Sequence, residues 1–465
     1  MPAGQGALVI ESSRPLHILH VVQGYLPAVG GTERVIQRIS EELVRQFGDT
    51  VSVFTTDAYS AEAFPRPSLP RLATGWWHHR GVAVRRFHTV RAFGPVLNQI
   101  QKAAWRLQIP GNQHIRTLYG GPLVPGLARA IAAHPADIVS SSSFPLAHMY
   151  AALRGARAAR RPCVFLGGLH PEDRWGYERA RIHRAIRRVD RYVSYTEFEK
   201  RFVVEHGADP ARVAVVPLGV DAEPFLAARP AEARQRLGIG PGGPVVGFVG
   251  QLGVNKGVAT LIEAMPGVWA RYPGAWLVIA GHRTTYSQRL EAMLATLPTA
   301  MRERVVKIED FPDALRPDLF AALDILAYPS GFESYGLSFL EAWAAGRPVV
   351  GCRRGAVGDV VEDERDGLLV PYEDAAALTN AVLRLAADPA WARALGAAGR
   401  RRVRERHTWP EVARKIRQVY CAAVDALPSR DGPAGTVPEE SALADERAGP
   451  HDHERHHGRP SGRDA

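Results

Sequence analysis

Two glutamates separated by seven residues are the clearest chemical signal in this sequence. Glu333 and Glu341 flank Gly336 in the segment PSGFESYGLSFLEAWAAGRPVV, whose pattern predicts a loop and then a helix that begins at the glycine. Such a helix start offers free backbone N–H groups and a positive dipole end, which suit a phosphate. A carboxylate accepts paired hydrogen bonds from the vicinal hydroxyls of a sugar or ribose. The segment therefore predicts a sugar or nucleotide site, with ordinary surface glutamates as the alternative.

A second loop, GQLGVNKG, places Lys256 at the start of another predicted helix, where its ammonium can reach a phosphate. This loop lacks the GK[ST] ending of a P-loop, and no GxGxxG follows the first predicted strand, so an NTPase and a nicotinamide cofactor are both disfavoured. The sequence contains no Asp-x-Asp pair. Metal-dependent diphosphate chemistry is therefore disfavoured, and no metal or cofactor is expected.

The elements that must position these loops form two series. In the first half, the runs at 16–22 and 51–55 are predicted strands, and between them lies a helix that Thr32 could cap. Further strands are predicted at 137–141, 163–168, 191–196 and 213–217. The region of about 58–125 lacks this alternation and is expected to be an insertion. The alternation itself predicts a doubly wound α/β domain, whose ligands bind at the carboxyl ends of the strands.

A second series follows a shift to Ala, Arg, Pro and Gly, with strands predicted at PVVGFVG, AWLVIAG, RVVKI, DILAYPS and RPVVG. The fold class is thus α/β, with two Rossmann-like domains facing a central cleft. The predicted organisation is a flexible leader at 1–14, a first Rossmann-like domain at 15–225, a linker at 226–243, a second Rossmann-like domain at 244–408, a helix at 409–427 that packs back on the first domain, and a disordered tail at 428–465.

Composition narrows the function classes. The 465 residues are 46% hydrophobic and 23% charged, which fits two or three globular domains. The net charge of +10 raises a nucleic-acid or anionic-membrane hypothesis, but arginine spread along the whole chain fits codon usage equally well. Three distant cysteines without CxxC spacing indicate neither disulfides nor zinc. With no signal peptide and no run of about 18 apolar residues, a cytoplasmic protein is expected.

Taken together, the motifs resemble those of the retaining glycosyltransferases of family 4, which have the GT-B architecture. The resemblance rests on the Glu333-x7-Glu341 region with the downstream GCRRGAVGDVVEDERDGLLVPYED, and on PAVGGTERVIQRISEEL, VVPLGVD and RRVRERHTWPEVARKI. It covers about residues 16–427 and implies that 15–225 is the acceptor domain and 244–408 the nucleotide-sugar donor domain. It implies that Glu333 contacts the donor sugar and Glu341 holds the nucleotide ribose, while the backbone around Tyr335, Gly336 and Leu337 faces the diphosphate and sugar.

The same resemblance implies that Lys256 and the loop at Gly30 and Gly31 cradle the diphosphate, and that His170 lies near the sugar. A tight turn at the glycines and surface positions for Lys256 and His170 are the alternatives. One departure concerns Gln251, which stands where the family usually has Arg. The amide carries no charge, so donor binding could be weak, another Arg could substitute, or activity could be lost. The segment 308–313 also departs from the family, so the nucleobase cannot be predicted.

The implied activity is metal-independent transfer of a hexosyl unit from a nucleotide-diphosphate sugar to a hydroxyl acceptor, with retention. The acceptor is left open between a glycan, a lipid-linked molecule and a small metabolite. Residues 100–108 mix apolar, aromatic and basic side chains, which fits a helix on an anionic membrane at the inner face of the cell membrane and an internal helix equally. The alternatives are a catalytically inactive sugar-nucleotide-binding or scaffold subunit, and an epimerase or phosphorylase on the same architecture. No nucleic-acid partner is expected.

Overall fold

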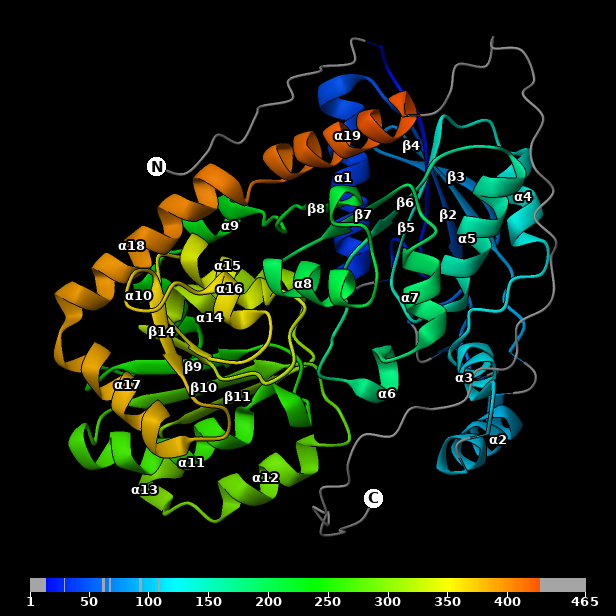
Figure 1. Ribbon diagram of the computed structural model, residues 1–465. Helices are drawn as coiled ribbons and strands as arrows, with labels where there is room; N and C mark the ends of the chain where they lie inside the picture. Colours follow the sequence, from blue (N-terminus) through cyan, green and yellow to red (C-terminus); the bar gives the residue numbers. More distant parts are fainter. Residues whose placement is uncertain are drawn as a thin grey trace. The chain divides into compact units, whose positions relative to one another are not determined.

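The computed structural model describes residues 14–426, except 29, 61–62, 67, 92–93 and 108. The predicted leader, apart from Arg14, and the predicted tail therefore lie outside the described residues. Within the described part the chain builds two β-sheets covered by helices (Figure 1). This arrangement confirms the predicted class of two Rossmann-like α/β sheets.

The first sheet has eight strands in the order β3-β4-β2-β1-β5-β6-β7-β8. Neighbouring strands are parallel except for the antiparallel β3–β4 pair. Its central strands are buried almost throughout, as expected for a parallel sheet with helices on both faces. The strands are β1 (His17–Val21), β2 (Thr50–Thr56), β3 (Gly75–His79), β4 (Val82–Phe87), β5 (Ile138–Ser142), β6 (Cys163–Leu166), β7 (Arg191–Ser194) and β8 (Val213–Val215).

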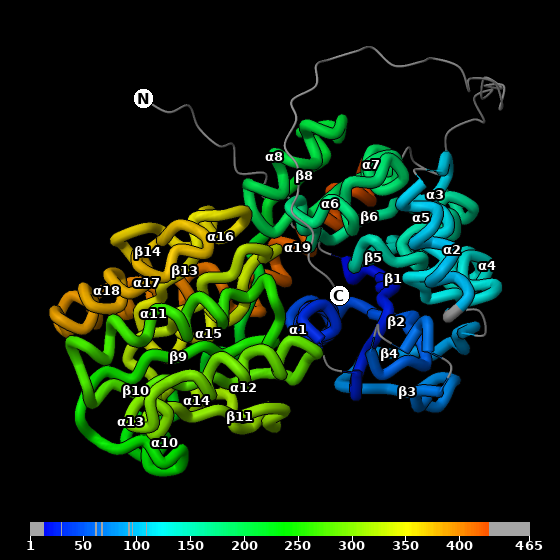
Figure 2. The backbone as a smooth tube through the Cα atoms, turned by 90° about the horizontal axis from the view of Figure 1, so that it is seen from below, coloured from blue at the N-terminus to red at the C-terminus, as the bar shows by residue number. Residues whose placement is uncertain are grey.

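Part of the segment 58–125 belongs to this sheet. β4 pairs in parallel with β2, and β3 folds back onto β4 at the edge. Val82 and Val84 are fully buried against the core, whereas Trp76 on β3 is half exposed. The rest of the segment contributes α2 (Gly94–Arg106) and α3 (Asn112–Gly120), which lie side by side (Figure 2). The short buried run VAV extends the sheet although the surrounding residues show no clear alternation.

The second sheet is entirely parallel, in the order β11-β10-β9-β12-β13-β14. Its strands are β9 (Val245–Val249), β10 (Trp276–Gly281), β11 (Val305–Glu309), β12 (Ile325–Tyr328), β13 (Val349–Cys352) and β14 (Gly367–Val370). The first five match predicted runs. No strand was predicted at β14, because four residues after a polar segment carry too little periodicity.

Helices connect and cover the strands, and α1 (Gly31–Phe47) begins differently from the prediction. Its N-cap is Gly30, no side chain caps it, and Thr32 lies inside the first turn. The other helices are α4 (Leu127–Ala133), α5 (Ala147–Ala158), α6 (Arg174–Tyr177), α7 (Ala180–Ile186), α8 (Glu197–Glu205), α9 (Ala222–Ala227), α10 (Pro230–Arg236), α11 (Val258–Arg271), α12 (Ser287–Ala295), α13 (Thr299–Arg302), α14 (Arg316–Ala322), α15 (Leu337–Ala344), α16 (Val357–Val360), α17 (Ala375–Ala387), α18 (Pro389–Arg406) and α19 (Trp409–Asp425).

The last of these helices, α19, returns to the first sheet and lies beside α1 (Figure 1). The hydroxyl of Tyr420 donates to Ser140 at 2.8 Å and lies 3.0 Å from Nε2 of His20 on β1. Arg417 pairs with the buried Asp49 at 2.9 Å. These contacts join the end of the described chain to its beginning.

Candidate active site

A cleft of about 650 Å³ opens where loops from the two sheets converge. Most of the residues singled out from the sequence line it, namely Gly30, Gly31, His170, Gln251, Lys256, Glu333, Tyr335, Gly336 and Leu337. Loops after β1, β6, β9 and β12 supply them, as parallel strands bring their carboxyl ends to one edge. Glu341 is the exception, because it does not line this cleft among the described residues.

The second half of the chain, which builds the second sheet, contributes an ion pair to the cleft. Lys256 ends a 3₁₀ turn at Val254–Lys256, and its Nζ lies 2.6 Å from Oε1 of Glu333 in the loop after β12. Gly257 follows with φ of 78°, in the left-handed region that favours glycine. Burial raises the pKa of Glu333, but Lys256, Ser330 and His170 together lower that pKa by more, so its net shift is downward and the carboxylate is ionised at neutral pH.

His170 brings an imidazole from the first half to the same place. It follows β6, and its ring lies 5.3 Å from that of Tyr177. Burial lowers the pKa of His170, while the charge of Glu333 raises it and that of Lys256 lowers it further. The net shift of this pKa is downward, so the ring is neutral at pH 7 and can donate one hydrogen bond to a ligand or accept one from it. His170, Lys256 and Glu333 thus lie close enough to influence one another electrostatically across the cleft.

The start of α15 presents backbone donors to the cleft, as predicted. Gly336 is the N-cap with φ of 93°, and a Cβ there would come within 2.6 Å of Cδ2 of Phe339. The next residue, Leu337, begins the helix, so the N–H groups of the first turn lack intrahelical partners. Tyr335 contributes only its backbone, because its hydroxyl lies 3.3 Å from Nδ1 of the buried His407.

Glu341 lies in the second turn of α15 and is held by an arginine that the sequence reasoning missed. Nε of Arg316 donates to Oε1 at 2.6 Å and Nη2 donates to Oε2 at 2.7 Å. Glu341 is 5% exposed, whereas Arg316 lines the main cleft. A carboxylate has about four lone-pair sites, so this fork leaves room for two further hydrogen bonds. No spacing pattern in the sequence predicts the Arg316–Glu341 pair, because its members are 25 residues apart on different helices.

A carboxylate also covers the glycine loop at the start of α1. Glu33 folds back over Gly30, where a Cβ would overlap its oxygens, and accepts a hydrogen bond from Nε2 of Gln23 at 2.9 Å. Burial raises the pKa of Glu33 above its usual range. Gly31 has open space around its Cβ position. The sequence did contain a signal for this contact. Glu33 stands three residues after the N-cap, and a glutamate at that position often reaches back to the N-cap residue.

Glu172 was likewise missed, although its loop GGLHPED was singled out. Both of its carboxylate oxygens are buried without a hydrogen-bond partner among the described residues, and they lie beside Gly355 of the second half. Burial raises the pKa of Glu172 and the charge of Arg354 opposes this. A buried carboxylate without a partner is unusual, but Glu172 is not among the described residues that line the cleft.

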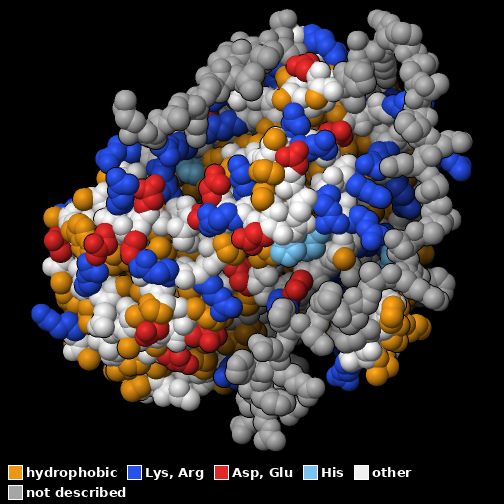
Figure 3. All heavy atoms as spheres, viewed as in Figure 1, with side chains coloured by type: hydrophobic (Ala, Val, Ile, Leu, Met, Phe, Trp, Pro, Cys, Tyr) orange, Lys and Arg blue, Asp and Glu red, His pale blue; other side chains and the backbone are white. Residues whose placement is uncertain are grey.

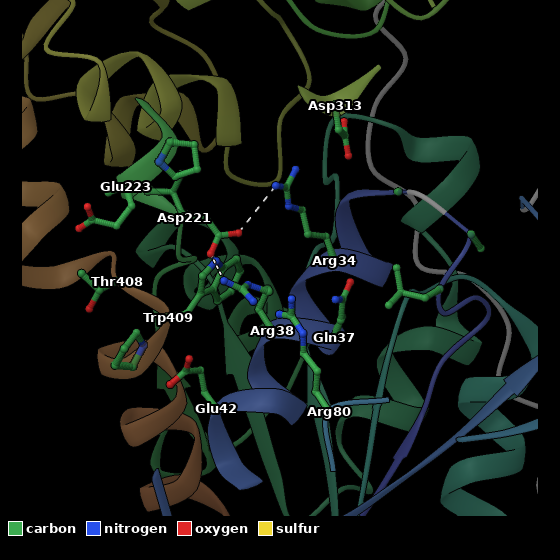
Figure 4. A pocket seen from close by; sticks show the side chains of 17 residues that line it. Arg34, Gln37, Arg38, Glu42, Arg80, Asp221, Glu223, Asp313, Thr408 and Trp409 are labelled. Carbon is green, nitrogen blue, oxygen red and sulfur yellow. Dashed lines mark hydrogen bonds and ion pairs between the residues drawn. The ribbon is translucent and has the colours of Figure 1, made fainter. Parts of the chain in front are cut away.

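A second pocket of about 660 Å³ lies on the other side of α1 and shares Gly30 with the cleft. Arg34 and Arg38 point from α1 toward Asp221, which pairs with both (Figure 4). Further carboxylates, Glu42, Glu223 and Asp313, balance the cationic side chains of this pocket. Its mixed charge indicates no particular ligand, and its ion pairs connect α1 to the segment that leads to the second sheet.

No group of three or more His, Cys, Asp or Glu side chains is arranged to hold a metal ion among the described residues. None of the helices in residues 14–426 combines the length and apolar character needed to cross a bilayer.

Comparison with known proteins agrees with this geometry. The family model described as Glycosyltransferase Family 4 matches residues 29–224, and that described as Glycosyl transferases group 1 matches residues 243–388. A D-inositol 3-phosphate glycosyltransferase of Segniliparus rotundus is 33% identical over 237 residues, 50% of this chain and 53% of that protein. The glycogen synthase of Mycobacterium tuberculosis is 30% identical over 304 residues, 63% of this chain and 67% of that protein.

Among solved structures, Anabaena Alr3699/HepE in complex with UDP and glucose matches with a TM-score of 0.65 and 19% identity, over 88% of this chain and all of that chain. Fold and cleft define a GT-B glycosyltransferase architecture. The chain belongs to glycosyltransferase family 4, which confirms the resemblance predicted from the sequence. It spans about half the length of the first curated relatives that it matches.

Proposed function

We propose that the protein transfers a hexosyl unit from a nucleotide-diphosphate sugar to a hydroxyl acceptor, with retention at the anomeric carbon and without a metal ion. The observation that carries this proposal is the meeting of His170 from one half with the Lys256–Glu333 pair of the other in one cleft. The start of α15 adds backbone donors beside them. Family membership and the similarity to a D-inositol 3-phosphate glycosyltransferase support glycosyl transfer.

The proposed chemistry needs stabilised charges rather than a protein nucleophile. The leaving diphosphate gains negative charge as the sugar becomes oxocarbenium-like, and fixed donors aimed at that charge lower the barrier. Lys256 and the first turn of α15 would supply them, while Glu333 and the neutral His170 would hold sugar hydroxyls. The acceptor hydroxyl would attack from the side of the leaving group, and a phosphate oxygen would take its proton. Closure of the two halves would exclude water.

Nucleotide binding provides the direct test. UDP, GDP, ADP and their sugar conjugates are titrated calorimetrically and by thermal shift, because a ligand that binds only the folded state raises the melting temperature. One nucleotide should stabilise the wild-type protein, and Lys256→Ala and Glu341→Ala should lose most of this effect. Lys307→Ala is the matched control, since Lys307 of β11 pairs with Glu291 of α12 and does not line the cleft. A wild-type protein that no nucleotide stabilises would contradict the proposal.

Product analysis then tests the chemical claims. Activity that persists in EDTA would support metal independence, and NMR of the product would show whether the anomeric configuration is retained. Nucleotide binding without release of free nucleotide from any sugar conjugate, with or without acceptors, would instead favour the inactive binding or scaffold subunit. This second candidate is motivated by the uncharged Gln251.

We also propose that α2 lies on an anionic membrane, where a lipid-linked acceptor would be presented. Val96, Ile100 and Leu107 are 60%, 46% and 72% exposed, and hydrophobic side chains gather over this part of the surface (Figure 3). The surrounding sequence, residues 63–136, contains no Asp or Glu but many Arg. Exposed apolar residues among cationic ones are typical of a helix at a lipid interface.

Vesicle sedimentation tests this surface. The protein should bind vesicles that contain phosphatidylglycerol and not those of phosphatidylcholine alone, and added salt should weaken the binding. Ile100→Glu with Leu107→Glu should abolish it. Val254→Glu is the control, because Val254 is equally exposed (63%) but lies in the second half. Equal binding to both vesicle types, or none, would refute the membrane contact.

A further inference from the structure

The cleft has few cationic side chains with which to balance a diphosphate. Among the described residues that line it, the Lys and Arg side chains are Lys256 and Arg316. Lys256 is already paired with Glu333 at 2.6 Å, and Glu33 brings another carboxylate to the wall. Gln251, in the same loop as Lys256, is uncharged. A diphosphate carries at least two negative charges, so Lys256 alone does not balance it.

Arg316 is placed to supply the second charge. It is the first residue of α14, its side chain is 18% exposed, and it lines the cleft. Only one edge of its guanidinium, Nε and Nη2, is used by Glu341. Nη1 makes no hydrogen bond to any residue that the structure describes. Since a guanidinium has five N–H donors in a planar fork, two remain for a ligand at Nη1.

A buried tyrosine, Tyr328, lines the same cleft as Arg316 and packs behind the loop of Gln251. The ring of Tyr328 stacks on Phe248 with centroids 4.9 Å apart, and a Cβ at Gly250 would lie 2.8 Å from its Cε2. Burial and the charge of Glu333 raise the pKa of Tyr328, while the charge of Arg316 opposes that rise. Tyr328 is therefore within electrostatic reach of both ion pairs and packs directly behind Gly250.

We propose that Arg316 binds the phosphates of the nucleotide donor and supplies the positive charge that Gln251 lacks, while its other edge orients Glu341. This inference rests on the proposed function. Nη1 donates to a phosphate oxygen, and the fork to Glu341 stays intact. The chain thus carries its second phosphate-binding cation on α14 instead of on the loop after β9.

Paired ligands separate phosphate binding from a merely structural role. Arg316→Gln should weaken UDP, or whichever diphosphate the wild type prefers, by about 10- to 100-fold, the loss expected for hydrogen bonds to a charged group. Binding of the corresponding nucleoside should weaken less, because it loses only the orientation of Glu341 and no phosphate contact. Arg234→Gln is the matched control, since Arg234 pairs with Asp324 at 2.7 Å in the same half and does not line the cleft. It should leave both affinities unchanged.

A double variant tests whether a cation on the loop after β9 can replace Arg316. In the Arg316→Gln background, Gln251→Arg should restore much of the diphosphate affinity, since it returns a cation to the same wall. Equal losses for nucleoside and diphosphate, together with no rescue by Gln251→Arg, would overturn the inference and reduce Arg316 to a positioning residue for Glu341. A wild-type protein that binds no nucleoside diphosphate would overturn the proposed function and this inference with it.

Discussion

At the scale of single residues, the ion pair between Lys256 and Glu333 couples the stability of the cleft to its chemistry. Their side chains are 19% and 9% exposed, so neither charge is well solvated without the other. Lys256→Met should lower the free energy of unfolding by about 2–4 kcal/mol at pH 7, between the cost of an unsatisfied buried polar group and that of breaking a fully buried pair. Thermal melts of the variant and the wild type measure the difference.

The pH dependence of this loss has a definite sign. The folded-state pKa of Glu333 lies below its ordinary value of 4.5, so the pair stabilises the fold above that pH and the contribution disappears as the pH falls through the lowered pKa. Lys256→Met removes the main cause that opposes burial, so the pKa of Glu333 should rise and protonation of its carboxyl should relieve the variant. Its deficit should therefore shrink from pH 7 to pH 5. A deficit that is constant over this range, or as large in Lys256→Met with Glu333→Gln, would contradict the account.

At the scale of elements, the connection from β12 to α15 depends on one glycine. Gly336→Ala forces a side chain into a left-handed conformation (φ of 93°) against Phe339. Strain of this kind costs about 1–3 kcal/mol, so we expect a lower melting temperature and weaker nucleotide binding. Gly358→Ala in α16 is the control, because its Cβ position is open and its φ is not positive, and its stability should be unchanged. Equal melting temperatures for the two variants would refute the strain argument.

The same elements show what the sequence could predict. Apolar runs such as VVGFV and ILAY predict buried parallel strands. Because the loops after parallel strands meet at one edge of the sheet, this prediction already places Lys256 near Glu333. Local pattern carries no information about partners from separate helices. Two residues were therefore not predicted. Arg316 binds Glu341 of the expected site, and Glu172 lies beside Gly355 of the other half. β14 was missed for its shortness.

At the scale of the whole described chain, two segments cross between the sheets, one at residues 218–224 and one at 407–410. Buried apolar side chains such as Val220 and Trp409 pack there, and polar contacts join the two segments to each other. Leu218 accepts a hydrogen bond from Nδ1 of His407 at 2.9 Å, and Val220 bridges to Thr408, so the two crossing segments pair with each other. Away from the crossings, Asp359 of α16 accepts hydrogen bonds from the N–H of Phe198 and from Arg201 of α8. Polar contacts such as those of Asp359 can break and reform at low cost, which suits the closure of the two halves proposed above.

Asp221 is the residue that ties the first crossing to α1 (Figure 4). Asp221→Ala leaves Arg38 bound to Glu41 but removes its link to the crossing, which should cost about 1–3 kcal/mol locally. Hydrogen exchange in residues 218–224 and 408–410 should quicken by about tenfold or more, while β1 and β9 keep their protection. Asp209→Ala is the control, because the Asp209–Arg212 pair is 53% exposed on both sides and lies in a surface turn. If exchange rises equally in both variants, or in neither, the crossing is held by the buried contacts of Trp409 and His407 rather than by Asp221.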